Sequence, residues 1–319
     1  MPIRNKFIPS GVIPACLLPF NEDFSIDERN YKKHLGDVAA VEGLSAITVN
    51  AHASEAHACS FEEQQRILEL SVSELPSMPV VNGIYADGSA YAARLASMAE
   101  AEGASALLVF PPNPIAMGGQ LRPEMALTHF KIIADSTDLP LIIFQYPMGG
   151  GLGHTLETLI QMAEEIPTIV AIKDWCNDGM LHERHIRVLQ NLSRPISVLT
   201  THSAWLMSSL IMGCDGLLSG AGSVIADLQV DLWRAVQSGD LARAQAINDR
   251  IYPMVQAFYA PPFLDMHNRM KEVAVLLGRL PKAVVRPPLC KLSHSEIEVL
   301  GRALKDAGIG PLGAGQRAA

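Results

Sequence analysis

The sequence predicts an α/β fold, a (β/α)₈ TIM barrel followed by a C-terminal α-helical extension. Eight short apolar runs alternate with amphipathic stretches between Gly11 and Gly222, and this alternation predicts a parallel sheet whose strands are joined by helices. Eight is also the number of strands that closes such a barrel. After Gly222 only helical patterns follow. A chain of 319 residues is long enough for one barrel of about 250 residues and an appendage.

The elements follow one another at regular intervals. Strands are expected at residues 12–20, 44–51, 79–85, 104–111, 139–147, 169–175, 196–201 and 216–220. Helices are expected at 27–41, 60–75, 89–102, 123–136, 155–165, 180–192 and 203–212, and in the extension at 226–237, 240–259, 263–277 and 293–307. Ser60-Phe-Glu-Glu has the form of a capping box, and Gly103 and Gly213 stand where helix C-termini favour glycine.

These patterns divide the chain into three parts. We expect a barrel domain at residues 1–224 and a helical domain at 225–309. Residues 310–319 offer little to bury and are predicted to form a disordered tail.

Composition narrows the class of partner. Hydrophobic residues make up 49% of the chain and charged residues only 18%, which favours helix faces buried between subunits. We therefore expect a homo-oligomer, either a tetramer or a dimer. The net charge of -8 comes without any basic block. This excludes nucleic acid and membrane surfaces as partners and favours a small-molecule ligand.

The cysteines and the N-terminus bear on the cellular compartment. The five cysteines are far apart and form no CxxC pair, so we predict no metal site, no disulfide and reduced thiols. The first residues, Met-Pro-Ile-Arg-Asn-Lys-Phe, lack the apolar core of a signal peptide, and no apolar run approaches membrane-spanning length. A soluble, cytoplasmic protein is expected.

The apolar run at 168–173 ends in a lysine. Such a run between helical patterns is typical of a strand buried on both faces, so the amine of Lys173 is expected at a buried strand end. Desolvation lowers the pKa of a lysine and leaves part of the amine neutral and nucleophilic near pH 7. The alternative is a side chain that reaches solvent past the strand end or pairs with Asp174.

Further polar residues follow the other predicted strands, and in this fold chemistry takes place where the strands end. His52 can move protons near neutral pH or pair with a carboxylate, unless Glu55 or the backbone satisfies it. Tyr146 either acts with it or only packs. The candidate catalytic residues are Lys173, His52 and Tyr146. The candidate substrate-binding residues are Ala53, Ser54, Phe144, Thr201, His202, Ser219 and Gly220.

Other features have a functional and a structural interpretation. His182 and His185 lie within one helical turn and have no carboxylate partner in register, so a solvated helix face is favoured over a metal site. Trp175 and Cys176 either wall off a pocket or pack under a loop, and packing is slightly favoured. The glycines at 149–151 and 219–222 match neither a P-loop nor a dinucleotide fingerprint.

Together these motifs resemble the superfamily of dihydrodipicolinate synthase and N-acetylneuraminate lyase, which are class I lyases that form Schiff bases. The residues that carry the resemblance are, in order, Gly11-Val-Ile-Pro-Ala, Glu55 with Ser60-Phe-Glu-Glu, Tyr146-Pro147, Val170-Ala-Ile-Lys173, Gly213-Cys-Asp-Gly216, Arg286-Pro-Pro-Leu and Leu304-Lys-Asp-Ala-Gly308. The resemblance covers nearly the whole chain. It implies a barrel with a C-terminal helical domain, usually tetrameric, and an imine-forming lysine at Lys173.

The chain departs from this family after its second and fourth strands. The loop that usually reads Gly-Thr-Thr-Gly-Glu is here Ala51-His-Ala-Ser-Glu55. In the family those threonines help to hold the keto-acid carboxylate, and the first relays a proton. His52 stands at the position of that first threonine. The fourth strand ends in Pro111-Pro-Asn113, where the synthases carry two tyrosines, one of which reaches a neighbouring subunit.

A third departure lies on strand five, where the family has a tyrosine in a Tyr-Asn-Val-Pro pattern. Alignment on Pro147 puts Phe144 at that position. Side chains alternate along a strand, so Tyr146 faces the same side as Phe144 and can supply a hydroxyl from one layer higher.

The sequence therefore predicts a class I lyase in which Lys173 forms an imine with a small 2-oxo acid, with aldolase-type cleavage or condensation of a C–C bond. No cofactor and no metal are expected. The departures argue against a true dihydrodipicolinate synthase. The alternatives are a sugar-acid (2-keto-3-deoxy acid) dehydratase and, from another class, a non-catalytic keto-acid-binding protein on a lyase scaffold. We expect His52 to titrate near its usual pKa of about 6.5, on a loop that Glu55 can brace through a hydrogen bond.

Overall fold

Eight parallel strands form the centre of the molecule in a computed structural model that describes residues 7–310. The strands pair in the order β1-β8-β7-β6-β5-β4-β3-β2, and bridges from Val12 to Leu44 and from Ala15 to Thr48 join the two end strands. The strands are β1 (Gly11–Pro14), β2 (Ile47–Val49), β3 (Val80–Ile84), β4 (Ala106–Val109), β5 (Leu141–Gln145), β6 (Ile169–Asp174), β7 (Ser197–Thr200) and β8 (Gly216–Ser219). The predicted (β/α)₈ barrel is confirmed.

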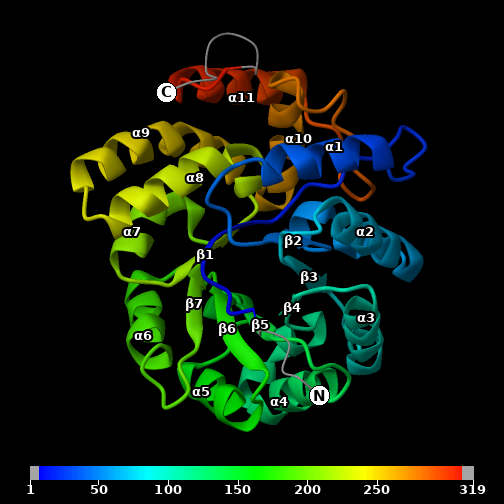
Figure 1. Cartoon of the computed structure of the whole chain (residues 1–319), viewed down its shortest axis with the longest axis vertical. Helices are drawn as coiled ribbons and strands as arrows, with labels where there is room; N and C mark the ends of the chain where they lie inside the picture. The colour runs from blue at the N-terminus through cyan, green and yellow to red at the C-terminus, as the bar shows by residue number, and fades with distance from the viewer. Residues whose placement is uncertain (1–6, 311–319) are drawn as a thin grey trace.

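Helices follow the strands in turn and surround them (Figure 1). They are α1 (Glu28–Ala39), α2 (Phe61–Glu74), α3 (Ser89–Ala101), α4 (Pro123–Ala134), α5 (Leu156–Glu165), α6 (Gly179–Leu189), α7 (Leu206–Ile211) and α8 (Gly222–Gln237). The capping box at the start of α2 is confirmed, because Ser60 accepts from the Glu63 N–H and the Glu63 carboxylate accepts from the Ser60 N–H. The expected strand at 12–20 is too long. The strand ends at Pro14 with one further bridge at Ala15, and the Leu17 N–H then donates to Ser223 Oγ.

Three more helices form the predicted extension, α9 (Leu241–Phe258), α10 (Met266–Leu276) and α11 (His294–Asp306). They gather on one side of the barrel, where the chain runs from yellow to red in Figure 1. Residues 263–265, expected to begin α10, form a separate 3₁₀ turn, η7 (Phe263–Asp265). The proposed boundary after residue 224 falls inside α8, next to Ile225, whose backbone is not helical. The division into domains stays a prediction, and the predicted tail beyond Gly310 lies outside the described residues.

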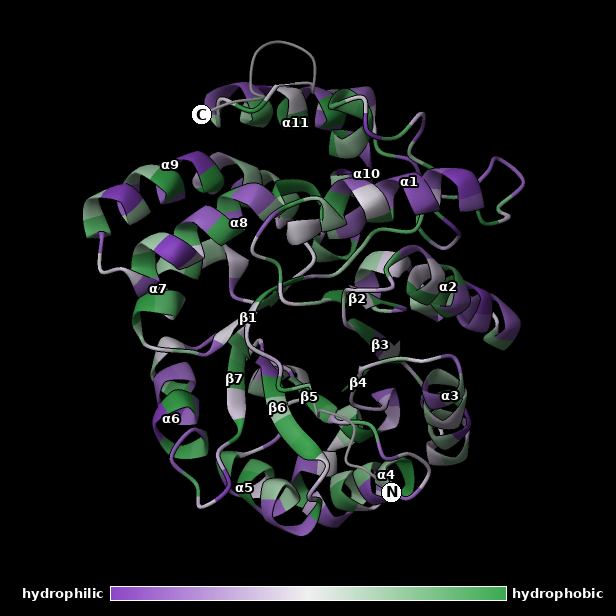
Figure 2. Ribbon diagram, viewed as in Figure 1, coloured by the Kyte–Doolittle hydropathy of each residue, from purple (hydrophilic) through white to green (hydrophobic). Residues whose placement is uncertain are grey.

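The apolar residues lie where the pattern of the sequence predicts. Every strand residue is buried except Gly11, Val170 and Ser197, which are partly exposed. The outer helices alternate apolar and hydrophilic faces (Figure 2), as amphipathic helices do when one stripe packs on a sheet. Within residues 7–310 the cysteines form no disulfide. In the same range, no helix is both long and apolar enough to cross a bilayer.

Short 3₁₀ turns occupy several of the segments that leave the carboxyl ends of the strands. η1 (His52–Ser54) and η2 (Ala56–Ala58) follow β2, η3 (Asn113–Met117) and η4 (Gly119–Leu121) follow β4, η5 (Met148–Gly150) follows β5, and η6 (Ser203–Trp205) follows β7. Backbone held in such tight turns places several polar side chains at one end of the barrel. The candidate site is built there.

Candidate active site

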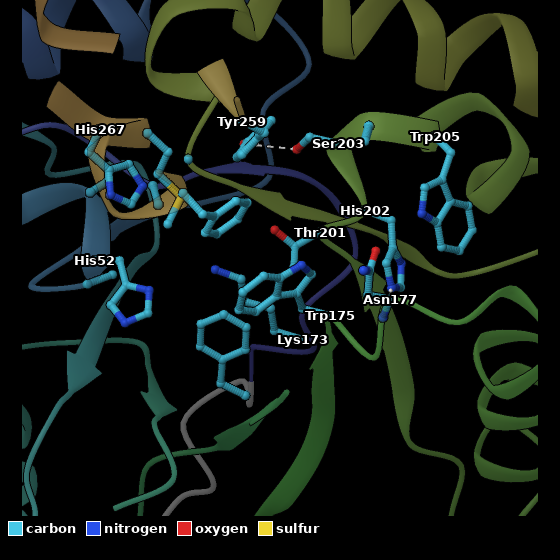
Figure 3. Close-up of a pocket in the computed structure, with 18 residues that line it drawn as sticks. His52, Lys173, Trp175, Asn177, Thr201, His202, Ser203, Trp205, Tyr259 and His267 are labelled. Carbon is cyan, nitrogen blue, oxygen red and sulfur yellow. Dashed lines mark hydrogen bonds between the residues drawn. The ribbon is translucent and has the colours of Figure 1, made fainter. Parts of the chain in front are cut away.

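A cavity of about 310 Å³ opens at the carboxyl ends of the strands, between the barrel and the C-terminal helices. Figure 3 shows Lys173 and Trp175 near its centre, His52 and His267 on one side, and His202 and Trp205 on the other. The predicted site residues that line the cavity are Lys173, His52, Ala53, Phe144, Thr201, His202 and Gly220. The structure therefore brings together predicted site residues from five different strand ends.

Lys173 lies near the end of β6, where it pairs in register with Phe144 of β5. Its side chain is directed into the cavity, and its Nζ lies 4.1 Å from the centre of the Phe144 ring. Only 6% of the residue is exposed. Burial in this apolar setting lowers the pKa of the Lys173 amine to about 7. Near neutral pH a large share of the amine is thus neutral and nucleophilic.

The alternatives for Lys173 are contradicted by this geometry. The side chain does not reach solvent, and no ion pair within residues 7–310 involves it. Asp174 follows it on the strand and so faces the opposite side, towards α6. There the Asp174 carboxylate accepts from His182 Nδ1 at 2.8 Å and from His185 Nδ1 at 2.7 Å.

The expectation of a solvated face at His182 and His185 is therefore wrong, since both side chains are fully buried. The carboxylate partner that their own helix lacks comes from the end of β6. Burial alone raises the pKa of the Asp174 carboxyl, but the hydrogen bonds from the two imidazoles hold it well below its ordinary value. Asp174 stays ionised and fixes α6 against the strand that carries Lys173.

This carboxylate begins a buried polar network. His182 Nε2 lies 2.7 Å from Ser209 Oγ, which donates to Thr200 Oγ1 at 2.5 Å, and Thr200 in turn lies 3.1 Å from His202 Nδ1. The Asn177 N–H donates to His202 Nε2 at 3.1 Å. The network joins β6, α6, β7 and α7 beneath one wall of the cavity.

Four members of this region are of the types that hold transition metals. Donor atoms of Asp174, Cys176, His182 and His202 lie within 4.8 Å of one another. No spacing in the sequence announced this set, because its members come from two strand ends and a helix. The Asp174 carboxylate and His202 Nε2 already accept hydrogen bonds from other groups of the protein. The arrangement is thus accounted for as a hydrogen-bond network.

His52 lies at the start of η1 and faces Lys173 across the cavity. The expectation that it titrates near pH 6.5 is wrong. Burial, and then the charge of Lys173, lower the pKa of His52 to about 3, so the imidazole is neutral. Glu55 anchors the loop, as expected, but its carboxylate is not the partner of the imidazole. The Glu55 carboxylate accepts instead from Lys271 Nζ at 2.5 Å and from the Arg286 N–H at 2.9 Å.

Tyr146, and not Glu55, is the hydrogen-bond partner of the His52 imidazole. Its hydroxyl lies 3.1 Å from His52 Nε2, and its ring lies 4.5 Å from that of Phe144, on the same side of β5 as the alternation along the strand predicts. Burial raises the pKa of the Tyr146 phenol above its ordinary value, so the phenol stays protonated. Tyr146 does not itself line the cavity. It reaches the cavity through His52.

Two predicted substrate-binding residues are not on the cavity wall. Ser54 Oγ donates to the Cys16 carbonyl at 2.9 Å, and Ser219 Oγ accepts from Gln229 Nε2 at 3.1 Å. The Ser54 hydroxyl thus fixes the backbone beside the site, whereas the Ser219 hydroxyl bonds to the side chains of Gln229 and Ser203. Gly220 does line the cavity, and a Cβ atom there would lie 2.8 Å from His267 Nε2. The absence of a side chain at this position is what admits the imidazole.

The site also contains residues that the sequence analysis missed. Trp205 and Asn177 belong to loops of the barrel, whereas Tyr259, Phe263, Met266 and His267 come from the C-terminal helices. Burial lowers the pKa of His267 well below its ordinary value. No local motif marks the four residues of the extension, because only its packing over the barrel mouth brings them there. Trp175, for which packing was favoured, is part of the cavity wall.

Fold and site together define a (β/α)₈-barrel protein with a cavity around a buried lysine at the carboxyl ends of its strands. The chain belongs to the Dihydrodipicolinate synthetase family, whose sequence model matches residues 8–307. The resemblance drawn from the motifs is confirmed at the level of the family.

Relatives with this fold match nearly the full length of the chain. The 4-hydroxy-tetrahydrodipicolinate synthase of Gluconacetobacter diazotrophicus is 30% identical over 302 residues, covering 94% of this chain and 97% of the relative. That of Methanococcoides burtonii is 26% identical over 301 residues, covering 93% and 98%. Among solved structures, dihydrodipicolinate synthase from Aquifex aeolicus has a TM-score of 0.84 at 23% identity, covering 95% of this chain and 100% of that one.

One solved relative was crystallised with a small keto acid. YagE from E. coli, a prophage protein of the dihydrodipicolinic acid synthase family in complex with pyruvate, has a TM-score of 0.85 at 22% identity, covering 94% of this chain and 99% of that one.

Proposed function

We propose that the protein is a class I lyase whose Lys173 forms an imine with the ketone of a small 2-oxo acid, and that it cleaves or forms a C–C bond in the manner of an aldolase. The observation that carries this proposal is the buried amine of Lys173, with a pKa of about 7, inside the cavity at the carboxyl ends of the strands. Membership of the family and the pyruvate complex of YagE support it.

The proposed chemistry needs a nucleophile and a proton carrier. The neutral Lys173 amine attacks the ketone carbon, and loss of water from the carbinolamine leaves an imine that draws electrons from the adjacent bonds. A base then removes the proton of a hydroxyl at C4. The C3–C4 bond breaks, the aldehyde leaves, and the electron pair forms an enamine. Protonation at C3 and addition of water return the free lysine and pyruvate.

We assign the proton transfers to His52 with Tyr146 behind it. A neutral imidazole with its hydrogen on Nε2 can donate to the Tyr146 oxygen, 3.1 Å away, and keep the Nδ1 lone pair for the substrate. The phenol oxygen then stabilises the imidazolium that forms during transfer. This pair takes the place of the threonine and tyrosine hydroxyls that are usual in the family. We further assign Ala53, Thr201, His202, Phe144 and Gly220 to the walls that hold the substrate.

The proposed reaction is tested by trapping the imine. Pyruvate and borohydride should add the mass of the reduced keto acid to the peptide that contains Lys173, and a Lys173→Arg protein should gain none. If the adduct appears on another lysine, or if no 2-oxo acid in a broad panel gives one, the alternative of a non-catalytic keto-acid-binding protein is favoured. Elimination of water from a 2-keto-3-deoxy acid, without C–C cleavage, would favour the dehydratase.

We also propose that the protein is not a true dihydrodipicolinate synthase, although its relatives carry that name. The usual threonine and tyrosine hydroxyls are absent, with Ala53 and Phe144 among the residues that line the cavity in their place. We expect negligible condensation of pyruvate with aspartate semialdehyde, measured by consumption of the aldehyde. Turnover within the ordinary enzymatic range of about 1–10³ s⁻¹ would contradict this.

A further inference from the structure

We infer that the cavity selects 2-oxo acids whose arm beyond the reacting carbons is uncharged and aromatic, an inference that rests on the proposed imine at Lys173. Three observations lead to it. Stacked rings form two walls of the cavity. The residues that line the cavity include no lysine or arginine besides Lys173, and few of their polar groups are free to bind hydroxyls.

The first aromatic wall joins the barrel to the C-terminal helices. The rings of Trp175, after β6, and Phe263, in η7, stack at 5.0 Å with only 11° between their planes. Tyr259 also stacks on Phe263, with their ring centres 5.6 Å apart and 26° between their planes. All three side chains line the cavity. They present a broad apolar surface within the same cavity as Lys173.

A second stack lies beyond β7. His202 and Trp205 stack at 4.2 Å with 26° between their planes, and both line the cavity. Figure 3 shows this pair on the far side of Lys173 from His52. Aromatic rings prefer such offset-stacked or edge-to-face contacts, each worth about 0.5–1.5 kcal/mol beyond the area buried. An aromatic arm therefore finds suitable partners on two sides.

The charged residues of the cavity also favour an uncharged arm. Among the residues that line it, Lys173 is the only lysine or arginine, and none is an aspartate or glutamate. Burial keeps its histidines neutral, since it lowers the pKa of His52 and His202 to about 3 and that of His267 well below the ordinary value. Once Lys173 is bonded to the ketone carbon, its nitrogen lies beside the acid's own carboxylate, so a second carboxylate or a phosphate on the arm would be buried without a partner, which is costly.

Polar partners for a sugar-like arm are also few. Tyr259 donates to Ser203 Oγ at 3.1 Å, and both ring nitrogens of His202 are used by Thr200 and the Asn177 backbone. A chain of hydroxyls would leave water without recovering most of its hydrogen bonds. Thr201, His267 and the side-chain amide of Asn177 remain as groups that could bind a hydroxyl or carbonyl oxygen.

These limits define a substrate class for the aldol reaction. A 4-aryl-4-hydroxy-2-oxobutanoate places its carbonyl at Lys173, its hydroxyl near the proton carrier and its ring among the aromatic walls. Cleavage of the C3–C4 bond transfers the hydroxyl proton to the base and the electron pair to the enamine. After hydrolysis of the enamine's imine form, the products are pyruvate and an aromatic aldehyde. Condensation is the reverse of these steps.

The inference is tested by competition at the lysine. The whole protein is trapped with borohydride in equimolar 2-oxo-4-phenylbutanoate, 2-oxoglutarate and 2-keto-3-deoxygluconate, and the adducts on Lys173 are weighed and counted by mass spectrometry. These acids differ in bearing an aromatic, a carboxylate or a hydroxylated arm. We expect the aromatic acid to exceed each of the others about 10-fold or more. A parallel trap with pyruvate alone reports the proposed imine.

Two variants of one position make the test specific. Phe263→Ala should reduce the preference for the aromatic acid about 2–10-fold by removing one stacking partner. Phe263→Arg should raise the share of 2-oxoglutarate by supplying the missing cation at the cavity rim. Leu264→Ala changes the neighbouring side chain, which is exposed and does not line the cavity, and should leave the ratios unchanged.

The outcomes separate the two proposals. If pyruvate is trapped on Lys173 but the carboxylate or hydroxylated acid gives as much adduct as the aromatic one, or none of the three reacts, the selectivity is wrong and the imine stands. If neither pyruvate nor any other acid is trapped on Lys173, the proposed function fails and the selectivity fails with it.

Discussion

At the scale of single residues, burial decides the chemistry that each side chain can perform. Lys173 and His52 face the same cavity, and removal from water favours the neutral form of both. For the lysine this creates a nucleophile near pH 7, whereas for the histidine it removes the titration near 6.5 that the sequence alone predicts. The same effect thus activates one group and fixes the protonation state of the other.

The lowered pKa of Lys173 predicts the pH dependence of imine formation. Only the neutral amine attacks a ketone, and its pKa is about 7. The rate of trapping should therefore rise with pH through about 7 and level off above it, whereas an ordinary lysine would still be rising near pH 10. Measured from pH 5 to 9 with pyruvate, a rate that continues to climb tenfold per unit up to pH 9 would contradict the burial argument.

His52 is expected to carry most of the proton transfer. His52→Ala should lower kcat about 10²-fold or more, because a well-placed general acid–base contributes roughly 10²–10⁴-fold. Tyr146→Phe should have a smaller effect, since the imidazole remains in contact with the substrate. Because His52 stays neutral above pH 5, neither variant should remove a limb near pH 6.5 from the profile. If Tyr146→Phe abolishes turnover while His52→Ala leaves kcat unchanged, the proton transfer belongs to the tyrosine.

At the scale of elements, the loop that carries His52 is held by the C-terminal helices. Glu55 ends η1 in a left-handed conformation, and its carboxylate forms a buried ion pair with Lys271 of α10. His267 lies four residues before Lys271, on the same face of that helix. One face of α10 thus supplies a wall of the cavity and also anchors the loop opposite.

Removal of one partner of this ion pair should be strongly destabilising. Lys271→Met leaves the Glu55 carboxylate buried and unpaired, and a loss of about 3–5 kcal/mol in the free energy of unfolding is expected. The double variant Glu55→Gln with Lys271→Met should recover most of that loss. Lys282→Met is the matched control, because its pair with Glu22 is exposed and should change stability little. The free energies of unfolding are measured with urea. Equal losses in Lys271→Met and Lys282→Met would show that burial of the pair does not matter.

The elements also show what a single sequence can and cannot specify. The strand ends at Lys173, Phe144 and Thr201 follow from local patterns, and the structure places all three on one cavity. The partner of His182 does not follow, because Asp174 belongs to another element and only the packed fold brings them together. The same holds for His267, which reaches the cavity from α10, and for the pKa of His52, which depends on burial.

At the scale of the whole molecule, the surface carries apolar side chains that one chain leaves uncovered. Met117 and Leu121, in the turns after β4, are 89% and 86% exposed. The corresponding region is where the family resemblance places a contact with a neighbouring subunit. We propose that this surface is buried in a homo-oligomer, a tetramer or a dimer.

The oligomer is tested by light scattering coupled to size-exclusion chromatography. The protein should elute with a mass of two or four chains, and a Met117→Glu, Leu121→Glu double variant should shift towards the monomer. Met180→Glu places the same charge at an equally exposed methionine on α6 and should leave the mass unchanged. A monomeric wild-type protein, as is described for one solved synthase variant of this fold, would refute the proposal.

The stacked wall at Trp175 has a practical consequence. The chain contains three tryptophans, and two of them, Trp175 and Trp205, line the cavity, whereas Trp233 lies in α8 and does not. Their indole emission depends on the polarity and ring contacts of the surroundings, so entry of any keto acid replaces water beside two of the three fluorophores. The protein therefore carries a built-in optical reporter, by which occupancy of the cavity can be followed in an unlabelled sample before any reaction is known.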